Sequence, residues 1–250
     1  RCQHVRMSST TTSGTRERFH HGRLRDALID NALEAIAERG AEGFSLREAA
    51  HKAGVSPSAA YRHFEDKAAL LAEIARRAFA ELADAIEAAM DEAMRGRRAA
   101  ASRASAAFRA QGVAYVRFAL ANPTRYRVMF GPWGAGSGRD VAGRSAASGA
   151  TPYELLLKAV GDLLGEGVPD PVRQSAARFA WSASHGLADL LISRSVVPSG
   201  EAALDAMIME MVDRVEATLS SRRPPARARG EAPARRAGSV LAVRGIAKVR

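Results

Sequence analysis

Residues 44–70, FSLREAAHKAGVSPSAAYRHFEDKAAL, decide the fold. A Ser-x-x-Glu capping box near their start predicts a helix over 45–53, because the hydroxyl and the carboxylate can each satisfy a backbone N–H of the first turn. Gly54 ends that helix, and the Ser-Pro pair that follows supplies an N-cap and a proline at the first helical position. The stretch therefore predicts two short helices, over 45–53 and about 57–64, joined by a tight turn.

This pair of helices has two interpretations. Two short helices that cross steeply can place the second one in the major groove of DNA, which is about 12 Å wide. The inward side chains would then be Leu46, Ala49, Ala50, Val55, Ala60 and Phe64. The same spacing also fits a helical hairpin inside a larger core, in which Tyr61 and Phe64 are both packed. The spacing alone does not decide between the two.

The rest of the chain repeats apolar residues at steps of three and four, which indicates helices throughout. A long amphipathic helix is predicted over 66–90, with the apolar positions Leu71, Ile74, Ala78, Leu82, Ile86 and Met90. The other predicted helices cover 23–39, about 108–122, 123–130, 151–164, 170–193 and 200–219. Residues 131–150 contain six glycines and no periodicity, so we expect a flexible loop there. No alternating strand pattern occurs, and the fold class is all-α.

The composition excludes several classes of protein. The chain has 250 residues, of which 47% are hydrophobic and 26% charged, and no stretch approaches the roughly 20 apolar residues of a membrane span. The single Cys2 cannot form an intrachain disulfide or a cysteine metal cluster. Catalytic and nucleotide-binding motifs are missing. We therefore expect a cytoplasmic, nucleoid-associated protein that is not an enzyme and uses neither a cofactor nor a metal.

The net charge of +10 is unevenly distributed. Residues 66–220 carry 18 Lys and Arg against 18 Asp and Glu, whereas residues 221–250 carry 9 against 1. Because arginines among Pro, Ala and Gly cannot build an apolar face, we expect 221–250 to be a disordered basic tail. That tail is either a solvated extension or a DNA-binding arm. Residues 1–19, rich in Ser and Thr, are expected to be a flexible N-terminal arm.

The string from Gly54 to Leu70, GVSPSAAYRHFEDKAAL, resembles the signature of the TetR family of transcriptional regulators. In that signature a Tyr-x-His-Phe segment follows a Gly-Val-Ser turn and precedes a lysine. The Leu28-x3-Ala32-x3-Ile36 pattern also matches, and the resemblance covers about residues 20–75. It implies a three-helix DNA-binding domain over 20–66 and a helical effector-binding and dimerisation domain over 67–220. The chain departs from many relatives at 58–60, where it has Ser-Ala-Ala instead of Gly-Thr-Leu.

The resemblance implies roles for individual side chains on DNA. Backbone phosphates would be held by Ser45, Tyr61, His63 and Lys67, with Arg47 as a further candidate. Base edges would be read by Ser56, Ser58 and Arg62, although Arg62 fits a phosphate contact equally well. Ala59, which lacks a hydroxyl, would offer only an apolar contact to a thymine methyl group. Arg16, Arg18 and Arg23 either form an arm that reaches the duplex or are solvated surface residues.

A second resemblance lies in the C-terminal half. Residues 126–130, YRVMF, followed by Trp181-x3-His185-Gly186, are similar to the Trp-His-Gly effector domain found in part of this family. A mostly apolar small-molecule effector would be enclosed by Tyr115, Phe118, Met129, Phe130, Trp133, Trp181 and His185. For each of these residues the alternative is ordinary core packing.

The last two long helices imply a homodimer. The helix over 170–193 is apolar on two faces, one with Trp181 and His185 and another with Val172, Phe179, Ala183, Leu187 and Leu190. In this family such helices pair with their copies in a second subunit as a four-helix bundle. A matching stripe on the last helix comprises Leu204, Ile208, Met211, Val215 and Leu219. The alternative is that both stripes belong to the core of one subunit.

Together these features predict a repressor that a small-molecule ligand releases from a palindromic double-stranded DNA operator. The alternative is a non-inducible DNA-binding or tethering protein that relies on its basic tail. The operator, the effector and the direction of its response are not specified by the sequence.

Overall fold

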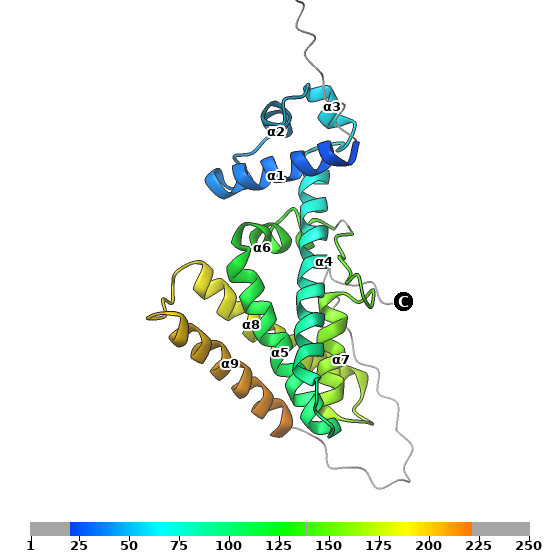
Figure 1. Ribbon diagram of the computed structural model, residues 1–250, viewed down its shortest axis with the longest axis vertical. Coiled ribbons are helices and arrows are strands. Elements are labelled where there is room, and N and C mark those ends of the chain that lie inside the picture. The colour runs from blue at the N-terminus through cyan, green and yellow to red at the C-terminus, as the bar shows by residue number, and fades with distance from the viewer. Residues whose placement is uncertain (1–20, 139, 222–250) are drawn as a thin grey trace, which may run out of the picture.

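The protein is all-helical in the part that the structure describes, residues 21–138 and 140–221 of this computed structural model (Figure 1). Predictions for residues 1–19 and 222–250 lie outside that part. The elements are α1 (His21–Arg39), α2 (Leu46–Lys52), α3 (Pro57–Tyr61), α4 (Lys67–Met94), α5 (Ala100–Ala121), α6 (Pro123–Phe130), the 3₁₀ turn η1 (Ala135–Ser137), α7 (Pro152–Leu164), α8 (Asp170–Ile192) and α9 (Glu201–Ser221). The predicted all-α fold is confirmed.

Helices α1 to α3 form a small unit at one end of the molecule (Figure 1). The hydroxyl of Ser45 accepts the N–H of Glu48 at 3.2 Å, as predicted, and so begins α2. The other half of the capping box is wrong, because the Glu48 carboxylate pairs with Arg39 of α1 instead of the N-cap backbone. The predicted inward side chains are buried, except that Val55 is only partly buried.

The second short helix is shorter than predicted. It ends at Tyr61 rather than near Phe64. The N–H groups of His63 and Phe64 both donate to the carbonyl oxygen of Ala60, at 2.9 and 3.0 Å. The chain is thus drawn into a turn that buries the Phe64 ring to 3% exposure within the unit.

Helix α4 connects this small unit to the rest of the protein (Figure 1). The carboxylate of Asp66 caps its first turn by accepting the N–H of Ala69 at 2.6 Å. The predicted apolar face from Leu71 to Met90 is buried along its whole length, and the helix continues to Met94. A single rigid element therefore runs from the α1–α3 unit into the C-terminal helices.

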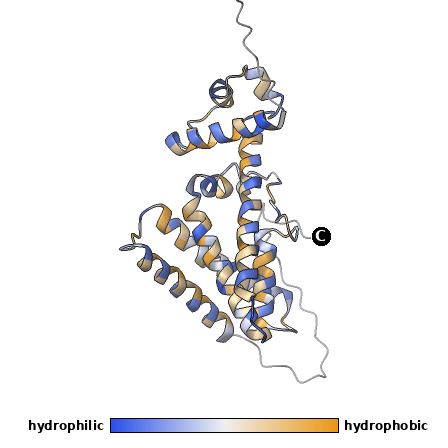
Figure 2. Cartoon of the chain, in the orientation of Figure 1, coloured by the Kyte–Doolittle hydropathy of each residue, from blue (hydrophilic) through white to orange (hydrophobic). Residues whose placement is uncertain are grey.

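The C-terminal helices pack around α5, which contacts α4, α7, α8 and α9. Hydrophobic and hydrophilic residues lie side by side along each of them (Figure 2). The predicted capping box of α7 forms in full: the hydroxyl of Thr151 accepts the N–H of Glu154 at 3.2 Å, and the Glu154 carboxylate accepts the N–H of Thr151 at 2.7 Å. Here sequence pattern and structure agree.

Part of the segment 131–150, predicted to be a flexible loop, packs closely against α4. Residues 140–150, which we call the strap, lie directly on α4. The side chain of Val141 is fully buried, and the N–H of Ala146 donates to the Asp84 carboxylate of α4 at 2.7 Å. At Gly143 a Cβ atom would lie 2.1 Å from the carbonyl oxygen of Arg76, so only glycine permits this approach. Gly143 therefore serves close packing between the strap and α4.

The apolar stripe of α9, predicted to face a second subunit, packs into the core of its own subunit instead. Ile208, Val215 and Leu219 are buried inside the subunit, and the other two members of the stripe are partly buried against its core. The large apolar side chains of α8 and α9 that remain exposed are Val172, Phe179, Leu190 and Met209. Of the two interpretations, core packing therefore applies to the α9 stripe, whereas one face of α8 stays uncovered, as a dimer interface would require.

A buried carboxylate joins α1 to α4. Glu73 of α4 has a side-chain exposure of 9% and accepts hydrogen bonds from Arg25 of α1 at 2.6 Å and from Arg76 and Arg77 of α4 at 2.8 and 2.9 Å. Arg77 also pairs with Asp26 of α1 at 2.7 Å. Burial by itself would raise the pKa of Glu73, but the three guanidinium groups outweigh it and lower the pKa to about 2.

This cluster predicts a pH-dependent stability. Because the folded-state pKa of Glu73 is lowered from 4.5 to about 2, its contribution is complete above pH 4.5 and is lost as the pH falls toward 2. The shift corresponds to about 3 kcal/mol, which solvent around the partly exposed guanidinium groups reduces to about 2 kcal/mol. Urea unfolding should find Glu73→Gln less stable than the wild type by that amount at pH 7, with a gap that narrows below pH 4.5.

The matched control is Glu38→Gln, which changes an exposed carboxylate of α1. It should leave the free energy of unfolding unchanged at each pH. A Glu73→Gln gap that stays constant from pH 7 to pH 3 would contradict the role of the cluster.

Candidate DNA-binding surface and candidate ligand cavity

The side chains predicted to contact DNA lie mostly on the surface of the α1–α3 unit. Ser45, Arg47, Ser56, Ser58, Tyr61 and Arg62 are exposed, and His63 and Lys67 are half-buried. Tyr61 has an exposed fraction of 46%, which excludes the interpretation in which it is a core residue. Ala59 differs from the rest: at 8% exposure its methyl group faces the core of the unit, so the expected thymine contact has no support.

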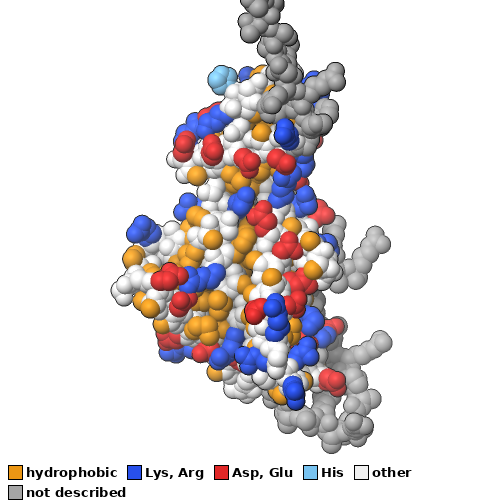
Figure 3. All heavy atoms as spheres, viewed as in Figure 1, with side chains coloured by type: hydrophobic (Ala, Val, Ile, Leu, Met, Phe, Trp, Pro, Cys, Tyr) orange, Lys and Arg blue, Asp and Glu red, His pale blue; other side chains and the backbone are white. Residues whose placement is uncertain are grey.

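Charge is unevenly distributed over the surface of the α1–α3 unit. Among the described residues, Arg47 and Arg62 form no ion pair, so both guanidinium groups can neutralise phosphate. The exposed carboxylates Asp26, Asp30, Glu34 and Glu38 recur every four residues along α1 and form an acidic row (Figure 3). Two of these carboxylates, Asp26 and Glu34, are paired with Arg77 and Lys52, so the α1 surface is partly neutralised. The guanidinium groups of Arg47 and Arg62, unpaired among the described residues, favour the α2–α3 side for DNA.

Lys67 has a structural role in addition to the predicted phosphate contact. Its ammonium group donates to the carbonyl oxygen of Glu42, between α1 and α2, at 3.1 Å. The same group lies 5.6 Å from the ring centroid of Trp133. Lys67 therefore holds the first turn of α4 between the α1–α3 unit and the segment that follows α6.

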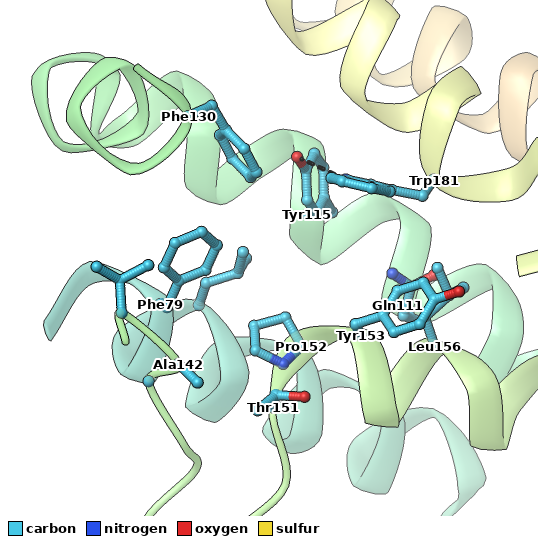
Figure 4. A pocket seen from close by; sticks show the side chains of 13 residues that line it. Phe79, Gln111, Tyr115, Phe130, Ala142, Thr151, Pro152, Tyr153, Leu156 and Trp181 are labelled. Carbon is cyan, nitrogen blue, oxygen red and sulfur yellow. Dashed lines mark hydrogen bonds between the residues drawn. The ribbon is translucent and has the colours of Figure 1, made fainter. Parts of the chain in front are cut away.

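A small cavity of about 40 Å³ lies between α4, α5, α7, α8 and the strap (Figure 4). Three residues predicted to bind ligand line it: Tyr115, Phe130 and Trp181. Sequence reasoning missed the others: Phe79, Leu82, Gln111, Val141, Ala142, Gly143, Thr151, Pro152, Tyr153 and Leu156. No lining residue is charged. The cavity is apolar, with few polar groups.

The other predicted ligand residues lie elsewhere. Met129 is fully buried in the core, and Phe118 packs against that core without lining the cavity. Trp133 lies beside the end of α1, in a groove between the α1–α3 unit and α6. His185 is behind the cavity wall.

A hydrogen-bonded cluster around His185 supports that wall. The hydroxyls of Tyr115 and Tyr126 lie 2.9 and 2.7 Å from its Nδ1 atom, and the indole N–H of Trp181 donates to the Tyr115 hydroxyl at 3.3 Å. Burial lowers the pKa of His185, against the opposing charge of Asp189. A neutral imidazole with its proton on Nε2 can accept a hydrogen bond at Nδ1 from one of the two phenols, which is consistent with these distances.

The two phenols remain neutral. Burial raises the pKa of Tyr115 well above its usual value, and burial likewise raises the pKa of Tyr126 to about 12. Tyr126 is a part of the site that sequence reasoning did not assign, although it begins the 126–130 motif. The cluster thus fixes the rings of Tyr115 and Trp181, which form one wall of the cavity.

A helix-turn-helix unit joined by one long helix to a helical domain defines a class of bacterial regulators, and comparisons specify the family. Residues 28–74 match the model described as bacterial regulatory proteins, tetR family. Residues 108–215 match the model described as tetracyclin repressor-like, C-terminal domain. Together the two matches cover more than half of the sequence, and the chain belongs to the TetR family of DNA-binding transcriptional regulators, which is not a family of enzymes.

Individual relatives agree with this. The HTH-type transcriptional regulator BetI of Rhizobium meliloti is 36% identical over 86 residues, which are 34% of this chain and 42% of BetI. A solved structure from Rhodococcus sp. RHA1, of unknown function, is 28% identical with a TM-score of 0.59, covering 82% of this chain and 97% of that one. A tetR-family regulatory protein from Rhodococcus RHA1 shares the fold at 19% identity and a TM-score of 0.50, covering 82% and 99%.

The described residues contain neither a candidate metal-binding group nor a candidate membrane-spanning helix. Over 21–138 and 140–221, no three His, Cys, Asp or Glu side chains are grouped so that they could hold a metal ion. In the same ranges, no helix is long and apolar enough to cross a membrane.

The His185 cluster predicts different effects for two similar substitutions. Tyr115→Phe removes the acceptor of the Trp181 N–H, so it should lower the free energy of unfolding by about 1–3 kcal/mol and shift the emission of Trp181. Tyr126→Phe leaves that N–H bonded and should not shift the emission. Both are measured in a Trp133→Phe background, in which Trp181 is the one remaining tryptophan. Equal emission shifts in the two variants would contradict the assigned hydrogen bond.

Proposed function

We propose that the protein is a homodimeric repressor that binds a palindromic operator and is released from it by a small-molecule ligand. The observation that carries this proposal is the path of α4. Phe79 and Leu82 of α4 line the cavity, and Glu73, on the same helix, binds Arg25 of α1. One helix therefore touches both the candidate effector site and the DNA-binding unit.

The distances favour mechanical coupling along this helix. Glu73 and Phe79 are six residues apart, which is about 9 Å along an α-helix. A ligand that displaces the Phe79 ring would shift or rotate α4, and the ion pairs of Glu73 would transmit that movement to α1. In a dimer this changes the separation of the two α3 helices, so they no longer match two half-sites.

The uncovered face of α8 supports the dimer. Val172, Phe179 and Leu190 are 45%, 47% and 45% exposed, and Met209 of α9 is 36% exposed. Large apolar side chains grouped on two helices usually mark an interaction surface. A second copy of the chain would cover them and give the two-fold symmetry that a palindromic operator requires.

The dimer proposal predicts the effect of a charge on this face. Phe179→Asp should convert the dimer to a monomer, because a buried unpaired carboxylate at the interface is costly. Val197→Asp is the matched control: Val197 is 65% exposed between α8 and α9 and should tolerate the same change. Light scattering measures both masses. A Phe179→Asp protein with the wild-type mass and fold would contradict the proposed interface.

The operator proposal is tested by selection of random duplex DNA at physiological salt. We expect the full chain and a chain ending at Ser221 to enrich the same palindrome, because the described α2–α3 surface supplies the specific contacts. Removing the basic residues 222–250 should only weaken the dependence of affinity on salt. If no palindrome emerges and the truncation abolishes binding, the tail-dependent tethering function replaces the repressor.

Tyr61→Ala serves as the control within this experiment. Because Tyr61 is exposed, the variant should keep its mass and thermal stability while its affinity for the selected duplex falls. Phe64→Ala, at a buried position, should lose stability instead.

A further inference from the structure

Gln111 is a polar side chain in the mostly apolar lining of the cavity. It lies on α5 one turn before Tyr115, is 5% exposed, and lines the cavity (Figure 4). Within the described residues its amide has no hydrogen-bond partner. The fully buried polar side-chain atoms without a hydrogen-bond partner among the described residues belong to Trp133 and Asp213, so the amide of Gln111 keeps some accessible surface where it lines the cavity. An amide in that position is available to a molecule in the cavity.

The other buried polar groups of the lining are already engaged. The hydroxyl of Thr151 accepts the N–H of Glu154 at 3.2 Å and caps α7. The hydroxyl of Tyr115 lies 2.9 Å from His185 Nδ1 and accepts from Trp181. Tyr153 is only half-buried. Among the buried polar lining residues that the structure describes, Gln111 is therefore the one whose side chain makes no hydrogen bond at all.

The remaining lining restricts the charge and size of a ligand. No charged side chain lines the cavity, so a charged ligand would be buried without a counterion, at a high cost in free energy. A space of about 40 Å³ has room for roughly three water molecules, so a ring-sized compound would press on the surrounding side chains. Aromatic rings from Phe79, Phe130 and Trp181 would pack against such a ring.

We propose that the cavity binds an uncharged aromatic compound of about one ring that carries a single hydroxyl or carbonyl group, and that Gln111 hydrogen-bonds this group. The inference rests on the proposed effector role of the cavity and names the chemical class of the effector. An amide both donates and accepts, so it can serve either oxygen. Gln111 thus determines specificity, whereas the apolar rings supply the contact area.

The test compares phenol with toluene, which have a ring and one substituent of similar size. Binding to the full chain is followed by Trp181 emission in the Trp133→Phe background and by calorimetry. In Gln111→Leu the ratio of the phenol Kd to the toluene Kd should rise about tenfold, because phenol loses one hydrogen bond and toluene loses none. Gln111→Met is the second variant, in case the branched side chain disturbs packing.

Gln174→Leu, a glutamine on α8 that does not line the cavity, should leave the ratio at its wild-type value. The proposal is overturned if the ratio is unchanged in both Gln111 variants, if benzoate binds more tightly than phenol, or if none of the three compounds binds up to its solubility limit.

Release of the selected duplex is measured separately. If phenol binds in a Gln111-dependent way while DNA stays bound, the ligand class stands and the proposed release mechanism fails. If phenol releases DNA equally well from the wild type and from Gln111→Leu, the release mechanism stands and the role of Gln111 fails.

Discussion

The carboxylate of Glu73 is the contact on which the relation between the two halves of the protein depends. It is buried on α4, where an unpaired charge would be strongly destabilising, and three guanidinium groups make that position tolerable. One of them, Arg25, also lies 4.9 Å from the ring centroid of Phe64. The α1–α3 unit is thereby attached to α4 through a directional ionic contact, and the same Arg25 contacts an aromatic ring inside the unit. Directional contacts fix orientation more strictly than apolar packing alone, which suits the proposed transmission of a small movement along α4.

Local sequence patterns predicted local structure well and distant partners poorly. The Thr151 capping box formed in full. Arg144 also contacts the Glu154 carboxylate, but that carboxylate still accepts the N–H of Thr151. In the Ser45 box the hydroxyl accepts the N–H of Glu48, but the Glu48 carboxylate pairs with the positive charge of Arg39 on α1 instead of the N-cap N–H. Nothing in the spacing of a capping box shows which helix will lie beside it. Periodicity likewise placed the apolar residues of α9 on one face, but it could not show that this face packs into the core of the same subunit.

The candidate cavity was predictable where an aromatic residue belongs to a recognisable motif, as for Trp181 and Phe130, whereas His185 of the same motif lies behind the cavity wall. Gln111 and Phe79 were missed, because a glutamine on a mostly apolar helix and a phenylalanine on a long amphipathic one both fit ordinary patterns. Trp133 was grouped with the cavity on residue type, whereas the structure places it beside Lys67. The finer resemblance to the Trp-His-Gly type remains a prediction. Burial of an unpartnered amide is visible only in three dimensions.

The fit of the strap against α4 has a consequence for the sensitivity of the protein. Gly143 lies so close to the α4 backbone that no side chain can be accommodated, and Val141 and Ala142 beside it close the cavity. If a ligand needs more space than the closed state provides, its apparent affinity is its intrinsic affinity reduced by the fraction of molecules already open. Under the proposed function, residues that hold the strap to α4, such as Asp84, would then set the effector concentration at which the protein responds, although Asp84 does not line the cavity. Natural variation along the strap would tune the threshold of response while leaving the chemical specificity of the cavity intact.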